Sequence, residues 1–157
     1  MSCNTIHGKV DDLVLAIKLT LNKDYPIYTN LANFSKLIKD YFDNTDWCGF
    51  YLVEKDNNLY LGPFQGETAT PFIEMGKGVC GTAAATKKSQ LVPNVHEFEG
   101  HIACDSASNS EIVIPIFVKD KVYGVLDIDS PLLNRFSEED EKVLSKAVKI
   151  LEEKLSK

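Results

Sequence analysis

Residues 111–129 read EIVIPIFVKDKVYGVLDID, and this stretch decides the fold. Two runs rich in β-branched and aromatic residues flank a polar turn at residues 119–121, which predicts a β-hairpin. Pro115 has no backbone N–H, so we expect it at an edge position or at a bulge. Residues 47–53 and 59–61 flank a second polar turn in the same way. The middle of the chain is therefore predicted to be a sheet built from hairpins.

Apolar residues recur at helical spacing on both sides of these hairpins. The spacing predicts two N-terminal helices within residues 8–43, the sheet and its loops over residues 46–130, and a C-terminal helix over residues 137–155. Ser137 followed by acidic residues is typical of a capped helix start. Helices, then hairpins, then a helix predict an α+β layout in one domain spanning residues 1–157.

The composition excludes several classes of protein. The chain has 157 residues, of which 44% are hydrophobic and 25% charged, as in globular proteins and unlike disordered or collagen-like chains. A net charge of -6 argues against a nucleic-acid partner. Its apolar runs are of strand length and its N-terminus does not resemble a signal peptide, so we expect no membrane segment and a cytoplasmic location.

Most of the glycines and loop-forming polar residues fall in residues 62–110, which predicts a long loop region. A stretch of small residues at 81–86 within this region suits one short helix. The four cysteines show no CxxC spacing, so neither a disulfide framework nor structural zinc is expected. Cys104 lies in a polar loop, where a thiol is either a nucleophile or inert, and His101 could serve it as a base or join it as a ligand. Cys80 is either functional or a small residue at a tight helix entry, and Cys48 alternates with aromatics as a core strand residue does.

Three carboxylates fall at the ends of neighbouring strands. Asp127 and Asp129 are two residues apart, so both side chains project from one face of a strand, and Glu111 could complete the group. One such carboxyl could act as a proton donor while another binds a cation. The alternatives are that Asp129 caps the turn at residues 130–131, or that the group binds a divalent cation. Trp47 and Tyr51 also share a strand face, as core residues or as the lining of a pocket.

With these residues assembled, the sequence resembles the free methionine-(R)-sulfoxide reductases, a family built on a GAF domain. The resemblance covers nearly the whole chain. It is carried by six blocks, at residues 47–51, 61–66, 78–83, 100–105, 108–113 and 124–130.

The resemblance implies a central six-stranded antiparallel sheet flanked by helices, with a small ligand enclosed beneath the loops of residues 62–110. Cys104 matches the catalytic cysteine of the family and Cys80 a resolving cysteine. The substrate-binding positions are matched by two aromatic residues around the methyl sulfoxide and by acidic residues that bind the amino group and polarise the sulfoxide: Trp47, Tyr51, Glu111, Asp127 and Asp129.

The chain departs from the family at Thr70, where members commonly carry a further cysteine. Resolution is left to Cys80 or to a thiol supplied in trans, with Cys48 as a weaker candidate. Thiol chemistry of this kind needs an external dithiol such as thioredoxin and no cofactor or metal. A homodimer through the exposed helices is compatible with the sequence.

Two other functions remain open from the sequence. A non-catalytic GAF sensor would bind a small ligand without turnover. A thiol-based oxidant sensor would use a disulfide between Cys80 and Cys104 as its signal, with no preference for one sulfoxide epimer.

Overall fold

A computed structural model describes residues 10–100 and 108–156. Its sheet has six antiparallel strands in the order β3-β2-β1-β6-β5-β4, which confirms the expected fold class. The strands are β1 (Trp47–Val53), β2 (Leu59–Gln65), β3 (Phe72–Ile73), β4 (Gln90–Val92), β5 (Ser110–Val118) and β6 (Lys121–Ser130). The β1–β2 and β5–β6 pairs are the two hairpins that the sequence predicts.

The tight β5–β6 turn follows from its two connecting residues. Lys119 and Asp120 adopt φ values of 53° and 64°, the left-handed region that a two-residue hairpin turn requires. Pro115 lies beyond Val113, the last residue of β5 that pairs with β4, so its missing N–H interrupts no ladder on that side. The register of β5 also shifts between Ile116 and Phe117.

The pairing of β1 with β6 joins the two hairpins into one sheet. Trp47 lies opposite Asp129, and Gly49 lies opposite Asp127. On the other side of β6, Asp129 lies opposite Glu111. This register brings residues that are far apart in the sequence to adjacent positions on three central strands.

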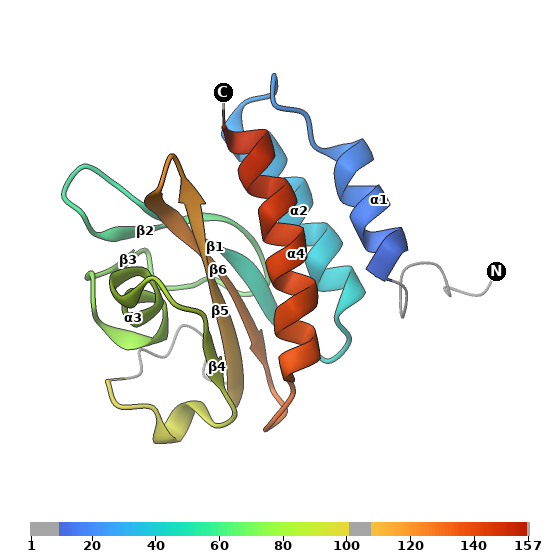
Figure 1. Cartoon of the computed structure of the whole chain (residues 1–157). Helices are drawn as coiled ribbons and strands as arrows, with labels where there is room; N and C mark the ends of the chain where they lie inside the picture. The colour runs from blue at the N-terminus through green and yellow to red at the C-terminus, as the bar shows by residue number, and fades with distance from the viewer. Residues whose placement is uncertain (1–9, 101–107, 157) are drawn as a thin grey trace.

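The helices cover the two faces of the sheet unequally (Figure 1). Helices α2 (Ile27–Tyr41) and α4 (Glu138–Leu155) pack on one face, over a large apolar core, and α1 (Val10–Thr20) packs on the outer side of these two helices. The opposite face is covered by α3 (Gly78–Thr86) and by loops that include the 3₁₀ helix η1 (Val95–Glu97). A smaller second core lies between this face and α3.

The start of α4 is a reciprocal capping box. Ser137 Oγ accepts a hydrogen bond from Asp140 N at 3.2 Å, and Asp140 Oδ2 accepts one from Ser137 N at 3.0 Å. Two of the N–H groups that a helix start leaves unpaired are thereby satisfied. The sequence prediction of this helix is confirmed to within one residue at its start.

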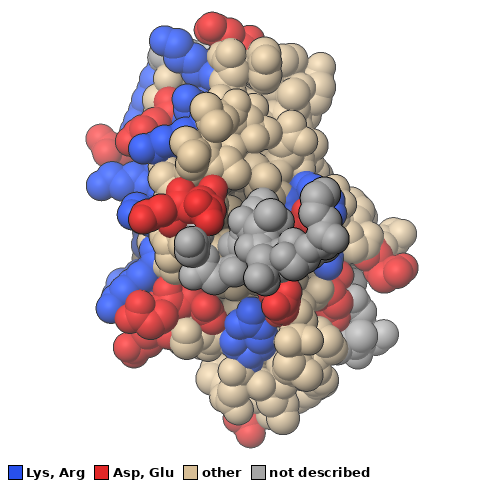
Figure 2. Space-filling view, turned by 90° about the vertical axis from the view of Figure 1, so that its right-hand side faces the viewer, with Lys and Arg blue, Asp and Glu red and all other residues tan. Residues whose placement is uncertain are grey.

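Charged residues form a band beside a broad uncharged area on the face shown in Figure 2. The exposed apolar side chains of the helical layer include Leu15, Leu19 and Tyr28. Across residues 10–100 and 108–156, none of the helices combines the length and the apolar character needed to cross a membrane.

Candidate active site

The sheet face beneath α3 carries a compact group of aromatic and acidic side chains. Alternation along β1 places Trp47 and Tyr51 on this face, and alternation along β6 does the same for Asp127 and Asp129. Glu111, at the second position of β5, lies beside Asp129. The β1–β6–β5 register therefore assembles the site, with no contribution from chain proximity.

The aromatic side chains form a continuous stack. The Trp47 and Tyr51 ring centroids are 6.0 Å apart with an interplanar angle of 24°, and Phe64 of β2 stacks on Trp47 at 5.3 Å. The indole N–H of Trp47 and the hydroxyl of Tyr51 both donate hydrogen bonds to the loop that follows β2. Trp47 Nε1 donates to Glu67 O at 3.0 Å, and Tyr51 Oη donates to Thr70 O at 2.9 Å. The aromatic pair thus fixes the loop that would cover a ligand.

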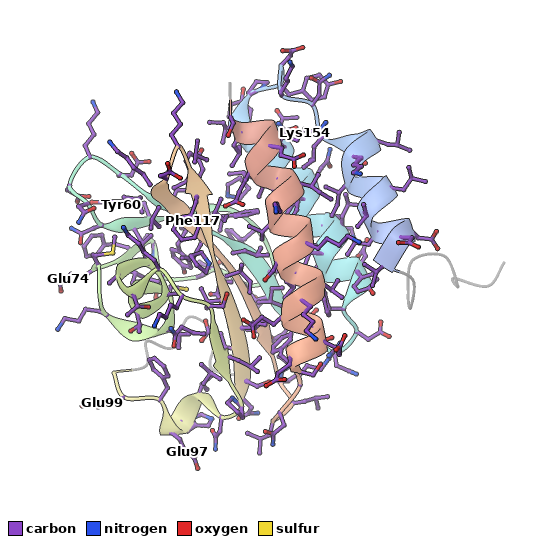
Figure 3. The ribbon with its side chains drawn as sticks, in the orientation of Figure 1. Tyr60, Glu74, Glu97, Glu99, Phe117 and Lys154 are labelled. Atoms are coloured by element: carbon purple, nitrogen blue, oxygen red, sulfur yellow. The ribbon has the colours of Figure 1, made fainter. Side chains whose placement is uncertain are left out.

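The three carboxyl groups are buried. Glu111 is 4% exposed, Asp127 0% and Asp129 2%, whereas Glu74, Glu97 and Glu99 extend outward from the α3 side of the molecule (Figure 3). Burial raises the pKa of Asp129 well above its ordinary value, and the charges of Asp127 and Asp46 raise it further.

A hydrogen bond links Asp129 to Glu111. This bond lowers the Asp129 pKa, but burial and the Asp127 charge outweigh it, so the net shift is upward. Because an ionised carboxylate can only accept, a hydrogen bond between two carboxyl groups requires a proton on one of them. The raised pKa makes Asp129 the group of the cluster that keeps its proton to a higher pH than an ordinary aspartic acid.

Cys80 occupies the third position of α3 and faces this cluster. Ligand atoms of Cys80, Glu111 and Asp127 all lie within 4.8 Å of one another. The backbone of α3 at Gly81 lies directly against the segment at residues 74–76. A Cβ at Gly81 would lie only 2.7 Å from Glu74 O, so glycine is needed there, and Gly76 N donates a hydrogen bond to Gly81 O at 3.0 Å. The divalent-cation alternative from the sequence uses Glu111, Asp127 and Asp129, whereas the ligand atoms that lie close together in the structure are those of Cys80, Glu111 and Asp127.

Asn109 anchors the chain at the C-terminal side of residues 101–107. Its N–H donates to Ser130 O at 2.8 Å, and its carbonyl accepts from Val95 N at 2.9 Å. Its side chain donates to Pro131 O at 2.6 Å and meets His96 Nε2 at 2.9 Å. Cys104 and His101 lie outside the described residues, but this anchor holds the following chain beside the end of β6.

Comparison with known proteins places the chain in a family. The GAF domain model matches residues 35–153. A protein of Escherichia coli (strain K12) named free methionine-R-sulfoxide reductase is 52% identical over 126 residues, which are 80% of this chain and 76% of that protein. The chain belongs to the GAF-domain family of free methionine-R-sulfoxide reductases.

Solved structures of family members share the architecture. The reduced form of fRMsr of Staphylococcus aureus superposes with a TM-score of 0.90 at 46% identity, over 94% of this chain and 96% of that one. A structure of the same protein in complex with its substrate gives a TM-score of 0.88 at 46% identity, over the same shares of the two chains.

In this member of the family, two alternatives from the sequence are wrong. Cys48 projects into the core beneath α2 and α4, on the opposite face of the sheet from Cys80. It is fully buried, and burial raises the pKa of its thiol well above the ordinary value, so it is not a nucleophile for the site. The turn after β6 is capped by Ser130 Oγ, which accepts from Leu132 N at 3.1 Å, and not by Asp129.

Two residues of the site were missed by sequence reasoning. Asp46 precedes β1, donates its backbone N–H to Asp129 O at 3.0 Å and raises the Asp129 pKa by its charge. Phe64 extends the aromatic stack. Both positions depend on strand pairing: Asp46 on the β1–β6 register and Phe64 on the β1–β2 register, where it lies opposite Gly49. The aromatic Phe64 in the 61–66 block was the only local signal.

Proposed function

We propose that the protein reduces free L-methionine-(R)-sulfoxide to L-methionine. One observation carries the proposal most directly: an aromatic stack and a buried carboxyl cluster, in which the pKa of Asp129 is raised, share one sheet face, and the Cys80 thiol of α3 faces them. The membership of the chain in the reductase family supports the same substrate, as does the substrate complex of its Staphylococcus aureus relative.

In this proposal the two ends of the substrate are recognised by opposite chemistry. The methyl sulfoxide lies against Trp47 and Tyr51, whose faces accept an apolar group. The ammonium lies against the carboxylates, with Asp127 as its main partner. The substrate carboxylate is bound by backbone N–H groups of the glycine-rich loops and of the α3 entry. A methionine sulfoxide inside a polypeptide has neither charge, so this arrangement favours the free amino acid.

The reaction begins with a proton and a thiolate. A sulfoxide becomes electrophilic at sulfur when its oxygen is protonated or hydrogen-bonded, and the raised pKa of Asp129 keeps a proton available for this purpose. Glu111, hydrogen-bonded to Asp129, can replace the proton. The Cys104 thiolate attacks the sulfur and forms an S–S bond while the oxygen takes up the proton. The hydroxyl then passes to the Cys104 sulfur as the S–S bond and the S–O bond of the substrate break, which releases methionine and leaves Cys104 as a sulfenic acid.

The oxidised cysteine is then resolved. The Cys80 thiol attacks the sulfenic sulfur, water leaves, and a disulfide between Cys80 and Cys104 forms. Thioredoxin reduces it by exchange and returns both thiols.

The deciding experiment follows loss of each sulfoxide epimer with thioredoxin, thioredoxin reductase and NADPH, beside a Cys104→Ser variant. We expect turnover of the R epimer alone and none in the variant. Release of one equivalent of methionine per protein without further turnover would leave the chemistry intact and contradict the proposed resolution and recycling by thioredoxin. Absence of any methionine would contradict the proposal and favour a GAF sensor that binds without turnover.

A further inference from the structure

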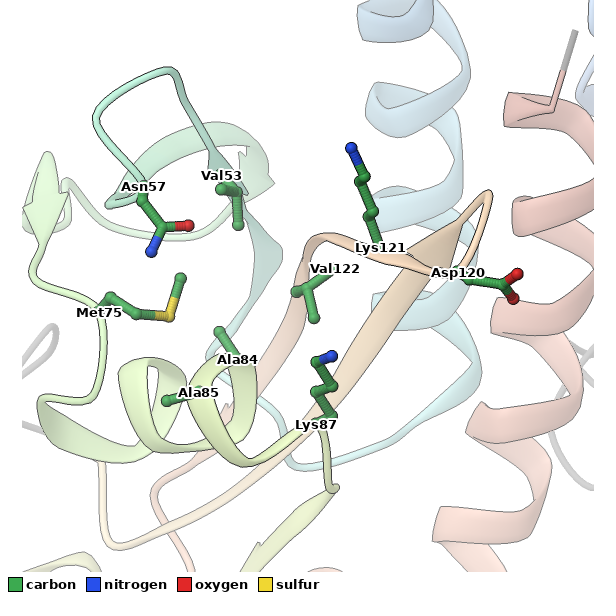
Figure 4. A pocket seen from close by; sticks show the side chains of 9 residues that line it. All are labelled: Val53, Asn57, Met75, Ala84, Ala85, Lys87, Asp120, Lys121 and Val122. Atoms are coloured by element: carbon green, nitrogen blue, oxygen red, sulfur yellow. The ribbon is translucent and has the colours of Figure 1, made fainter.

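A second pocket lies at the far end of α3 from Cys80 (Figure 4). Its volume is about 470 Å³, within the range of small-molecule sites. It is bounded by the C-terminal end of α3, the β1–β2 hairpin and the β5–β6 turn. None of its lining residues belongs to the carboxyl cluster or to the aromatic stack.

The pocket combines an apolar floor with a basic rim. Val53, Ala84 and Val122 supply aliphatic surface, and Met75 adds a flexible thioether on the opposite side. Lys87 and Lys121 both lie across from Asn57 and Met75, with Val122 between them, and the Lys121 side chain extends away from Lys87 (Figure 4). Neither lysine has an ion pair with another of the described residues. The Asp120 carboxylate points away from the pocket toward α4, so it does not neutralise them.

The backbone at the rim is held in an unfavourable conformation. Lys87, at the C-cap of α3, adopts φ 60° and ψ 32°, where glycine is the usual residue. Asn57 and Asp120 also have positive φ, at 65° and 64°. A lysine in this position costs about 1 kcal/mol relative to glycine. Left-handed residues other than glycine gather at functional sites, which is consistent with a use for the Lys87 side chain.

We propose that this pocket binds a small organic anion with an aliphatic body, and that its occupancy changes the reactivity of Cys80. The anionic group would lie at Lys87, in the positive field to which Lys121 adds, and the body against the aliphatic floor. The path to Cys80 is short: Met75 lines the pocket, and the N–H of the next residue, Gly76, binds the carbonyl of Gly81, which follows Cys80. Ala84 lies one helical turn beyond Cys80 on the same short helix.

Binding is tested with hexanoate as the probe, by amide chemical shifts of the full-length protein. Acetate carries the charge without the body, and hexylammonium carries the body with the opposite charge. We expect saturable shifts at Ala84, Ala85 and Val122 with hexanoate, which weaken as salt rises, and none that saturate with the other two probes. Equal shifts with hexanoate and hexylammonium, or none with hexanoate at millimolar concentration, would overturn the proposal.

Two variants locate the anionic end. Lys87→Gln and Lys121→Gln should each weaken hexanoate binding about two- to fivefold, whereas Lys18→Gln on α1 serves as the matched exposed control and should leave it unchanged. Unchanged binding in both rim variants would contradict the assignment of the lysines. Retained circular dichroism spectra exclude misfolding as the cause of any loss.

The coupling to Cys80 has a readout that does not require turnover. The rate of Cys80 alkylation, followed by mass spectrometry of its peptide, should change at least twofold when hexanoate is saturating in wild type and remain constant in the Lys87→Gln/Lys121→Gln variant. An equal rate with and without hexanoate in wild type would refute the coupling. Because neither assay uses a sulfoxide, this inference stands or fails independently of the proposed reductase activity.

Discussion

At the scale of single residues, Asp129 is the most unusual group that the structure describes. It is buried beside Glu111 and Asp127 and is hydrogen-bonded to Glu111. Burial and the neighbouring negative charge are costly for an ionised carboxylate, so Asp129 keeps its proton to a higher pH than an ordinary aspartic acid. The same proton is what a sulfoxide reduction needs, so the energetic penalty and the proposed chemistry have one origin.

We expect Asp129→Asn to lower kcat/KM by about a hundredfold or more, because an amide donates a hydrogen bond but cannot transfer a proton. Wild-type turnover should fall as pH rises through the raised pKa of Asp129, whereas the residual turnover of the variant should lose this limb. A pH–rate profile of both proteins checks the prediction. Near-normal rates in the variant would assign the proton donor to another group.

The same substitution should stabilise the fold at neutral pH. Since the folded pKa of Asp129 lies above its ordinary 3.8, the folded state binds more protons than the unfolded state between these two values. The stability is therefore greatest below about pH 3.8 for this group and falls as pH rises toward the folded pKa. Urea unfolding from pH 4 to 8 should show a smaller decline in Asp129→Asn than in wild type, with exposed Glu153→Gln on α4 as the control.

The cysteines offer a matched comparison. Cys80→Ala should allow release of one methionine and then stall, because the thiol that faces the carboxyl cluster is lost. Cys48→Ala should retain full turnover and lose about 1 kcal/mol of stability, since it leaves a small cavity on the helical side of the sheet. Methionine release counted per protein distinguishes the two. Multiple turnovers in Cys80→Ala would mean that another thiol resolves the sulfenic acid.

At the scale of elements, the sequence predicts what is local. The β5–β6 hairpin follows from its strand residues and turn, α4 from its periodicity and cap, and the short α3 from its small residues. The pairing of β1 with β6 could not be read in this way, because no local pattern specifies a partner more than seventy residues away. The two short strands β3 and β4 are also too brief for their own periodic signal.

The α4 capping box gives a prediction that separates stability from activity. Ser137→Ala removes the acceptor of the Asp140 N–H and should lower the unfolding free energy by about 1 kcal/mol, with sulfoxide turnover unchanged. Ser145→Ala, an exposed position within the same helix, should be neutral or slightly stabilising. Chemical denaturation of the two variants checks this prediction. Equal changes in the free energy of unfolding would show that the Ser137 cap does not stabilise α4.

At the scale of the whole molecule, the sheet separates two apolar regions of unequal size. The helical side carries the larger core, with α1, α2 and α4, whereas the site side is covered by one nine-residue helix and loops. The resemblance implies helices on the faces of the sheet, and alternation along β1 puts Cys48 on the face opposite Trp47 and Tyr51. Which face carries the site becomes visible only in the three-dimensional structure.

This asymmetry predicts uneven protection of backbone amides. Hydrogen exchange should be slowest in β1, β6 and α4 and fastest in α3 and the edge strands β3 and β4. Local opening costs less free energy where fewer buried contacts are lost, as in α3 and the edge strands. Free methionine sulfoxide should then slow exchange in α3 more than in α4. Equal protection of backbone amides in α3 and α4 would contradict the predicted difference between the two sides of the sheet.

The central position of the β1–β6 pair has a consequence for synthesis of the chain. Trp47 and its neighbours leave the ribosome early, whereas Asp127 and Asp129, their partners across the register, are made near the end. A nascent chain can therefore hold the aromatic half of the site but none of its β6 carboxylates until β6 is made. The proposed substrate-binding face is completed by the same event that closes the sheet, so we expect that a growing polypeptide does not bind the amino acid before β6 has paired with β1.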